Sequence, residues 1–95
     1  MLFAVVCTYS SEHVNTIVSR FASGVGEDEF PEGVRLVSRY HSPGTKWACS
    51  IVEVDDVVPL QLWLSEWIDV LEITVHPVTT DETVGPVVEA MLSRQ

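Results

Sequence analysis

The fold follows from one stretch of sequence, which reads VRLVSRYH over residues 34–41, SPGT over 42–45 and KWACSIVEV over 46–54. The two flanking runs are rich in β-branched and aromatic residues, and the four residues between them carry the strongest turn signal in the chain. Pro43 suits the first corner of a tight turn, and Gly44 can supply the positive φ of the second corner. The stretch therefore predicts a β-hairpin.

The predicted hairpin has two unlike faces. If Ser42 lies opposite Thr45, then Tyr40 lies opposite Trp47, and one face is nearly apolar because side chains alternate along each strand. Two-residue loops favour other turn types, so a connection that is longer by one residue is also open. The second face mixes basic, small and apolar side chains, namely Arg35, Val37, Arg39, His41, Lys46, Ala48, Ser50 and Val52.

The rest of the chain alternates strands and helices. Leu2–Tyr9 predicts a strand that is apolar on both sides, and Asp69–Val78 predicts the last strand. Apolar residues at helical spacing predict three helices. The first starts after Ser10 and the second at Asp55 or Asp56, and the third starts at Thr79 or Thr80, with Pro86 as the alternative start of its regular part. The order is β-α-β-β-α-β followed by one helix. This is the α+β, ferredoxin-like plan, with a four-stranded antiparallel sheet.

In this plan both main helices cover a single face of the sheet. The first strand is nevertheless apolar on both sides, so the second face also needs a cover. A second copy of the chain is the simplest one, which predicts a homodimer of the dimeric α/β-barrel kind. The polar side chains would then line the space between two sheets. A dimer interface formed by the helices remains the alternative.

Composition narrows the class of protein. A chain of 95 residues predicts a single domain over 1–95, and its formal net charge is −9. That charge argues against nucleic-acid binding and against docking on an anionic membrane. The N-terminal residues lack a basic leader, and Cys7 and Cys49 lack metal or redox spacing. We therefore expect a cytoplasmic protein with reduced cysteines.

No cofactor is predicted. His13, His41 and His76 lie on separate predicted elements, without the spacing of metal ligands or the context of a haem ligand. Gly24-Val25-Gly26 lacks the third glycine and the following helix of a phosphate-binding loop. The acidic run Glu27-Asp28-Glu29 is expected to be a solvated loop.

Six segments are distinctive: Met1-Leu2-Phe3, Glu12-His13, Pro31-Glu32-Gly33-Val34, Ser38-Arg39-Tyr40-His41, Val54-Asp55-Asp56, and Trp63 to Trp67 with Leu71. Together they resemble a small bacterial family, domain-of-unknown-function family 3303, and the resemblance extends to about Val78. That family's usual Gly-Arg-Trp-His corresponds to residues 38–41, so Arg39 and His41 match while two neighbours depart. Its usual Asp-Asp-Pro helix opening is stretched here to residues 55–59.

The family is similar to the dimeric α/β-barrel superfamily. That superfamily includes cofactor-independent monooxygenases, small isomerases, haem enzymes and ligand-sensing regulatory modules. The resemblance implies the fold, and it implies no established activity because one scaffold serves many functions.

Arg39 and His41 lie two apart on one predicted strand and therefore share a face. Facing a closed interior, Arg39 can hold an anionic or carbonyl group, and His41 can act as a general base or hydrogen-bond donor near neutral pH. Glu72 and His76 have the same kind of spacing on the last strand and are predicted to complete a ligand-binding pocket with them. The alternative is that Arg39 and Glu72 pair with each other, within one subunit or across two, only to satisfy buried charges.

Aromatic residues favour a structural interpretation. An aromatic box for a flat ligand would use Trp63, Trp67, Trp47 and Tyr40. Trp63 and Trp67 share a helical stripe with Leu60 and Leu64, however, and we expect these aromatic residues to belong to the core instead. Two functional hypotheses result. One is a small-molecule site in the dimer interior, either a binding site or a cofactor-independent monooxygenase or isomerase centre. The other is a non-catalytic dimeric interaction or accessory module.

Overall fold

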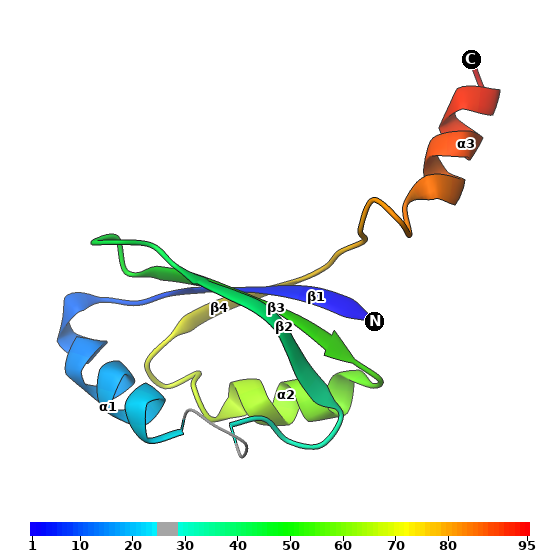
Figure 1. The fold of residues 1–95 in the computed structure, drawn as a ribbon. Helices are drawn as coiled ribbons and strands as arrows, with labels where there is room; N and C mark the ends of the chain where they lie inside the picture. The colour runs from blue at the N-terminus through cyan, green and yellow to red at the C-terminus, as the bar shows by residue number, and fades with distance from the viewer. Residues whose placement is uncertain (25–28) are drawn as a thin grey trace.

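The structure is a computed structural model that describes residues 1–24 and 29–95. Its elements are β1 (Leu2–Thr8), a 3₁₀ turn (Ser11–His13), α1 (Val14–Gly24), β2 (Val34–His41), β3 (Trp47–Val54), α2 (Val57–Ser65), β4 (Glu72–Pro77) and α3 (Gly85–Ser93). The strands form one antiparallel sheet in the order β2-β3-β1-β4. Figure 1 shows α1 and α2 on the same side of this sheet. The predicted α+β, ferredoxin-like plan is confirmed.

We call the side that carries α1 and α2 the helix face and the opposite side the open face. The core lies on the helix face, where Val5, Val52 and Val54 are completely buried. Leu60 and Trp63 of α2 pack on them and are less than one-tenth exposed. Burial of each such side chain contributes about 1.5–3 kcal/mol to stability. The structural interpretation of Leu60 and Trp63 is therefore confirmed.

The two covering helices begin differently. Asp56 caps α2, since its Oδ1 accepts a hydrogen bond of 2.9 Å from the Val58 N–H, and Pro59 lies in the first turn, where its missing N–H costs little. Ser10 precedes α1, but its hydroxyl donates to the Glu12 carboxylate at 3.4 Å instead of accepting from the backbone. The chain therefore enters α1 through a 3₁₀ turn. Helix α1 ends at Gly24, within the glycine-containing segment of residues 24–26. Residues 25 and 26 lie outside the described part of the chain.

The loop of the hairpin is two residues longer than the predicted two-residue loop. The Ser42 N–H donates to the Trp47 carbonyl oxygen at 2.9 Å, and Tyr40 pairs with Cys49 instead of Trp47. Gly44 takes the positive φ that its position predicts. A shift of two residues preserves the side-chain alternation, so the predicted faces are kept near the loop.

A β-bulge lies farther along β2, between Leu36 and Ser38. The extra residue reverses the alternation, so Arg35 pairs with Glu53 on the open face and does not share a face with Arg39. The prediction that Arg35 and Arg39 lie on one face is therefore wrong.

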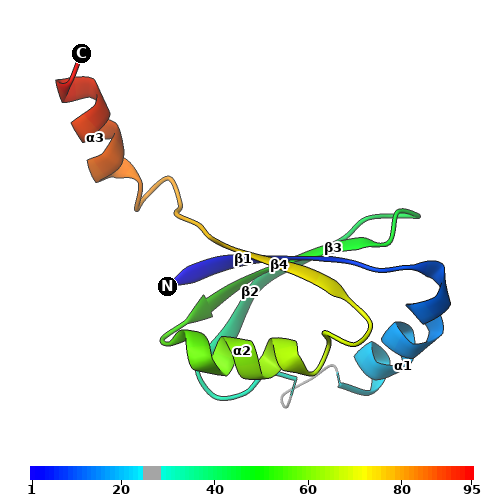
Figure 2. The same cartoon turned by 180° about the vertical axis from the view of Figure 1, so that it is seen from behind.

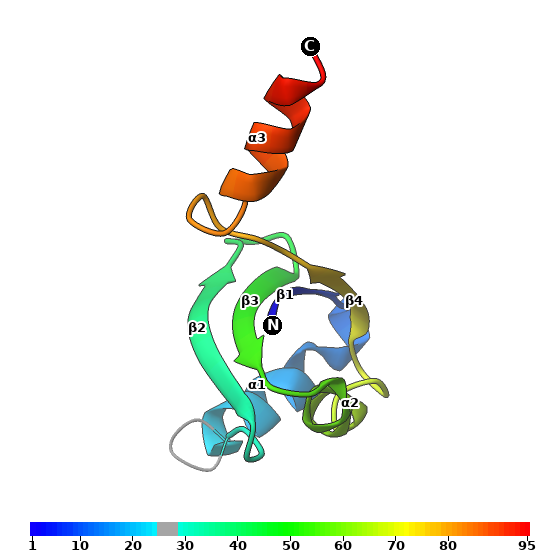
Figure 3. The same cartoon turned by 90° about the vertical axis from the view of Figure 1, so that its right-hand side faces the viewer.

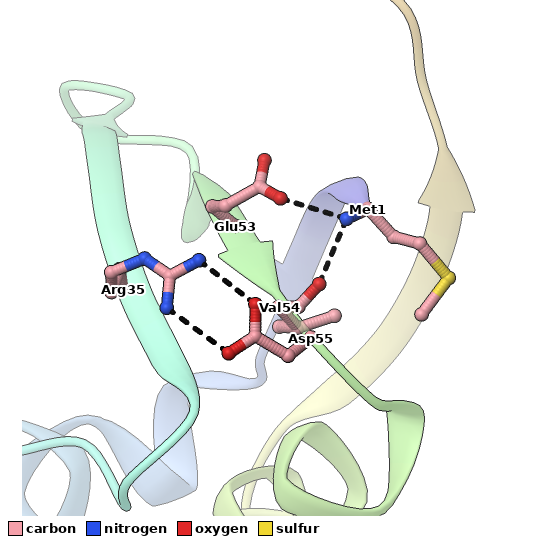
Figure 4. A network of polar contacts seen from close by, with 5 residues as sticks. All are labelled: Met1, Arg35, Glu53, Val54 and Asp55. Carbon is pink, nitrogen blue, oxygen red and sulfur yellow. Dashed lines mark hydrogen bonds and ion pairs between the residues drawn. The ribbon is translucent and has the colours of Figure 1, made fainter.

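Figure 4 shows the resulting contacts at the rim of the open face. The Arg35 guanidinium forms an ion pair with Asp55 at 3.2 Å. The Met1 amino group binds Glu53 Oε1 at 2.7 Å and the Val54 carbonyl oxygen at 2.8 Å. These contacts join β2 and β1 to the end of β3.

Helix α3 stands away from the sheet and its two covering helices. Figures 1 and 2 show it beyond the end of β4, displaced towards the side of the open face, and Figure 3 shows the same separation from the side. Among the described residues, no helix combines the length and the apolarity that crossing a bilayer requires.

Candidate functional site

A cavity of about 190 Å³ lies between the helix face of the sheet and the two covering helices. Its walls come from all four strands, from α1 and α2, and from the connection between α2 and β4. Most of the lining is apolar or aromatic, including Tyr9, Ile17, Phe21, Trp63, Trp67 and Ile73. Each lining strand residue points inward because it occupies the same alternating register as the core valines.

Arg39 enters the cavity from β2 and pairs with Glu29. Both side chains are largely buried, with 14% and 15% of their surfaces exposed. The guanidinium carbon lies 5.1 Å from the centre of the Phe21 ring and 5.6 Å from that of Phe30, within the range of cation–π attraction. The pair brings a neutralised polar group into an otherwise apolar wall.

His41 lies two residues beyond Arg39 on the same face, as predicted, and its imidazole lines the cavity. The imidazole meets the Phe21 ring nearly edge-on, with centroids 5.6 Å apart and planes 75° apart. The residue remains exposed. His41 is therefore placed where it can meet both solvent and a molecule in the cavity.

The floor of the cavity carries Cys7 from β1 and Ser50 from β3. Ser50 is the buried polar residue of the described core, with 8% of its surface exposed. Burial raises the pKa of the Cys7 thiol to about 11, with a smaller contribution in the same direction from Cys49 and an opposing one from Arg39. At neutral pH Cys7 is therefore a protonated thiol and a weak nucleophile.

The other two predicted site residues lie elsewhere. The partners of Glu72 and His76 across the ladder to β1 are Thr8 and Ala4, which project from the open face. The hydroxyl of Thr8 lies 3.5 Å from Glu72 Oε2, and His76 Nε2 lies 3.2 Å from Thr74 Oγ1. The structure thus brings Arg39 and His41 together and separates them from Glu72 and His76 by the thickness of the sheet.

Two expectations about charge need correction. The partner of Arg39 within the chain is Glu29 and not Glu72, because Glu72 projects from the opposite face. Glu29 was expected in a solvated acidic loop, yet it is mostly buried in the ion pair. The other two residues of that run, Glu27 and Asp28, lie outside the described residues.

Glu29 is the site residue that the sequence interpretation missed. The available signal was its neighbour Phe30, because phenylalanine is among the residues most often buried. Phe30 does pack on the core, with its ring centroid 4.8 Å from that of Trp63.

A second ion pair, between Arg20 and Asp69, lies where α1 meets the connection that follows α2. Arg20 donates two hydrogen bonds to the Asp69 carboxylate, at 2.9 and 2.6 Å, and a third to the Glu66 carbonyl oxygen at 3.0 Å. Its guanidinium also lies 6.0 Å from the centre of the Trp67 ring. This pair ties the two helical segments together next to the cavity.

Within residues 1–24 and 29–95, no group of three or more His, Cys, Asp or Glu side chains is arranged to hold a metal ion. The fold and the cavity define a ferredoxin-like α+β domain with an internal pocket between sheet and helices. The profile of the family described as Domain of unknown function (DUF3303) matches residues 1–92, and the chain belongs to that family. No curated protein and no solved structure gives a significant match.

Proposed function

We propose that the chain binds a small, planar, uncharged molecule in the cavity between the sheet and the two helices. The observation that carries the proposal is the cavity itself, with its volume of about 190 Å³ and its aromatic walls. An apolar cavity of roughly 150 Å³ is large enough for benzene. A flat molecule of one ring or two small fused rings, with one or two polar groups, therefore matches the cavity.

The charges around the cavity support an uncharged ligand. Among the described residues that line the cavity, the one Lys or Arg side chain is that of Arg39, which is paired with Glu29, so these residues offer no unpaired guanidinium or ammonium group to an anion. The formal net charge of −9 also repels anions at a distance. Hydrogen-bonding groups remain in Tyr9, His41 and Ser50. Phenols, indoles and quinones have the matching chemistry.

We extend the proposal to proton transfer on the bound molecule, of the kind that a cofactor-independent monooxygenase or an isomerase performs. His41 is the base, because its imidazole reaches both the cavity and solvent. Arg39, held between aromatic rings, is the polar anchor. The protonated Cys7 thiol supplies no nucleophile near neutral pH. The expected phenotype of His41→Asn is ligand binding without turnover.

We also propose a homodimer formed through the open face. Leu2, Ala4 and Val6 of β1 alternate onto this face, where Ala4 lies opposite Ile51 and Val6 opposite Cys49 of β3, while Leu2 lies opposite Glu53 at the rim. Neither α1 nor α2 covers them (Figure 1). Pairing two such faces would remove the exposed apolar surface from water in each copy. A reducing, cytoplasmic location fits the two free cysteines.

The binding proposal is tested by titrating the ¹⁵N-labelled protein with phenol, indole and 1-naphthol. Chemical shifts should change at Phe21, Ser50 and Trp63, with saturation at millimolar concentration or below. Ala48→Leu, which adds bulk to the cavity floor, should weaken binding at least tenfold. The matched control is Ala22→Leu, which adds the same atoms at an exposed position of α1. Shift changes confined to the open face, or none, would contradict the proposal.

The second candidate is a non-catalytic dimeric interaction or accessory module. It is favoured by the Arg39–Glu29 pair, since a charge that is already satisfied needs no ligand. On this hypothesis, Arg39→Met lowers stability and no compound in the panel binds. Saturable binding that is lost in Ala48→Leu and kept in Ala22→Leu decides for the ligand site.

A further inference from the structure

We propose that α3 is an arm exchanged between two copies of this chain, and that it packs into an apolar groove between α2 and β4 of the second copy. The inference extends the proposed homodimer. It is independent of the ligand site, because the cavity is built within a single copy.

The arm has an apolar stripe that no described part of the chain covers. Val84, Val87, Val88, Met91 and Leu92 recur at helical spacing, and the last four are between 46% and 61% exposed. A helix of nine residues is too short to be stable alone in water. Helices of this length in proteins owe their stability to the surface on which their apolar side packs.

A groove of matching chemistry lies on the outer flank of α2. It has a volume of about 380 Å³, and its lining is formed by Phe3, Val57, Leu60, Gln61, Leu64, Ser65, Ile68 and Val75. None of these side chains is charged. Val57, Ile68 and Val75 are exposed by 50%, 68% and 37%. Both α2, which forms one wall of the groove, and α3 contain nine residues, so each helix is about 14 Å long.

The segment that connects β4 to α3 disfavours packing of α3 into the groove of its own chain. The Val78 N–H still donates to the Leu2 carbonyl oxygen at 2.9 Å, which extends the β4 ladder. Two residues later, Thr80 and Thr83 exchange side-chain to backbone hydrogen bonds at 2.8 and 3.3 Å, and the Val84 N–H donates to the Thr80 carbonyl oxygen. Thr79 is therefore the single residue between two fixed segments.

This connection directs α3 away from the helix face, where its own groove lies, towards the side of the open face (Figures 1 and 2). A second copy that meets the open face would present its own helical layer farther along the same direction. Each copy carries a formal charge of −9, so contact between copies is favoured where both surfaces are uncharged. The stripe of α3 and the groove beside α2 satisfy this condition.

Cross-linking between two populations tests the exchange. In a Cys7→Ala, Cys49→Ala background, one population carries Met91→Cys and the other, with a different tag, carries Gln61→Cys. After mixing and mild oxidation, we expect a disulfide-linked dimer that contains both tags. The control is Glu89→Cys, on the opposite side of α3, which should give at least tenfold less product. A mixture that gives no linked dimer with both tags would overturn the proposal, and so would a third variant with both cysteines that forms its disulfide only within one chain.

Sedimentation of the full chain gives a second measurement. Met91→Glu should raise the dimer dissociation constant by at least roughly a hundredfold, because one apolar side chain is lost from each of the two exchanged arms. Glu89→Gln should leave the constant unchanged. A dimer that tolerates Met91→Glu overturns the exchanged arm and leaves the open-face dimer in place. Both Met91→Glu and Glu89→Gln should bind indole as the native chain does, because the cavity lies within a single copy.

Discussion

Arg39 and Glu29 form an ion pair inside the domain, between a strand of the sheet and the segment that leads into it, and only about one-seventh of each side chain is exposed. Two aromatic rings, those of Phe21 and Phe30, flank the guanidinium. The contact joins α1, the loop before β2 and β2 itself at the wall of the cavity.

Removal of either partner should destabilise the domain. Breaking a buried ion pair leaves an uncompensated charge and costs about 3–5 kcal/mol, and the partial exposure here reduces the expected loss to about 2 kcal/mol. Arg39→Met retains the apolar stem, and Glu29→Gln retains the shape of the carboxylate. Urea denaturation of both single variants and of the double variant measures the coupling. A coupling energy below about 0.5 kcal/mol would show that the pair contributes nothing specific.

Cys7 should react slowly with alkylating reagents. With its pKa raised from 9.0 to about 11, the reactive thiolate is about a hundredfold rarer at pH 8 than in a peptide cysteine. In the Cys49→Ala variant, the rate of modification by iodoacetamide should rise about tenfold per pH unit up to pH 11. The same rate in the native protein and in urea would contradict this prediction.

The same raised pKa links stability to alkaline pH. The unfolded state loses the Cys7 proton at lower pH than the folded state does, so this contribution to stability is complete below pH 9. It is lost as the pH rises from 9 to 11. Cys7→Ala should remove this part of the alkaline decline, whereas Cys49→Ala should retain it. Denaturant midpoints measured from pH 7 to pH 11 make the comparison.

Asp69 should titrate below the ordinary range of aspartate. The side-chain hydrogen bonds from Arg20 are the main cause of its lowered pKa, with the guanidinium charge acting in the same direction. The stabilisation is present above about pH 4 and is lost as the pH falls through the folded-state pKa. NMR titration of the Asp69 carboxyl carbon should show its midpoint move upward in Arg20→Gln. An unchanged midpoint in that variant would refute the assignment.

Much of this architecture could be predicted because it depends on alternation and on turn chemistry. The hairpin, the cap at Asp56 and the core role of Trp63 each follow from a local pattern. The bulge at Val37 could not be predicted, since VRLVSRYH contains no glycine or proline that marks it. One inserted residue then moved Arg35 to the opposite face.

The location of the cavity depends on contacts that are distant in sequence. The sequence placed Arg39 and His41 on one face correctly, but assigned that face to the space between two copies. A cationic side chain is stable beneath the helices because Glu29, ten residues earlier, neutralises it. No spacing rule predicts such a contact across a loop, and the acidic composition of residues 27–29 suggested solvent instead.

The open face provides the last prediction, that Ile51→Lys converts a dimer into a folded monomer. Ile51 lies on β3, next to Ala4 of β1, and both strands are central in the sheet. In a face-to-face dimer, a lysine at this central position would lose its hydration and bring a charge from each copy into the interface, which costs several kcal/mol. In a monomer the same lysine would reach water from the open face, so the domain should stay folded. Ala22→Lys adds the same charge on α1 and should leave the association unchanged. Sedimentation equilibrium and circular dichroism distinguish the outcomes, and a native protein that is monomeric at 100-micromolar concentration, on the order of a weak dimer's dissociation constant, would remove the basis for this pairing.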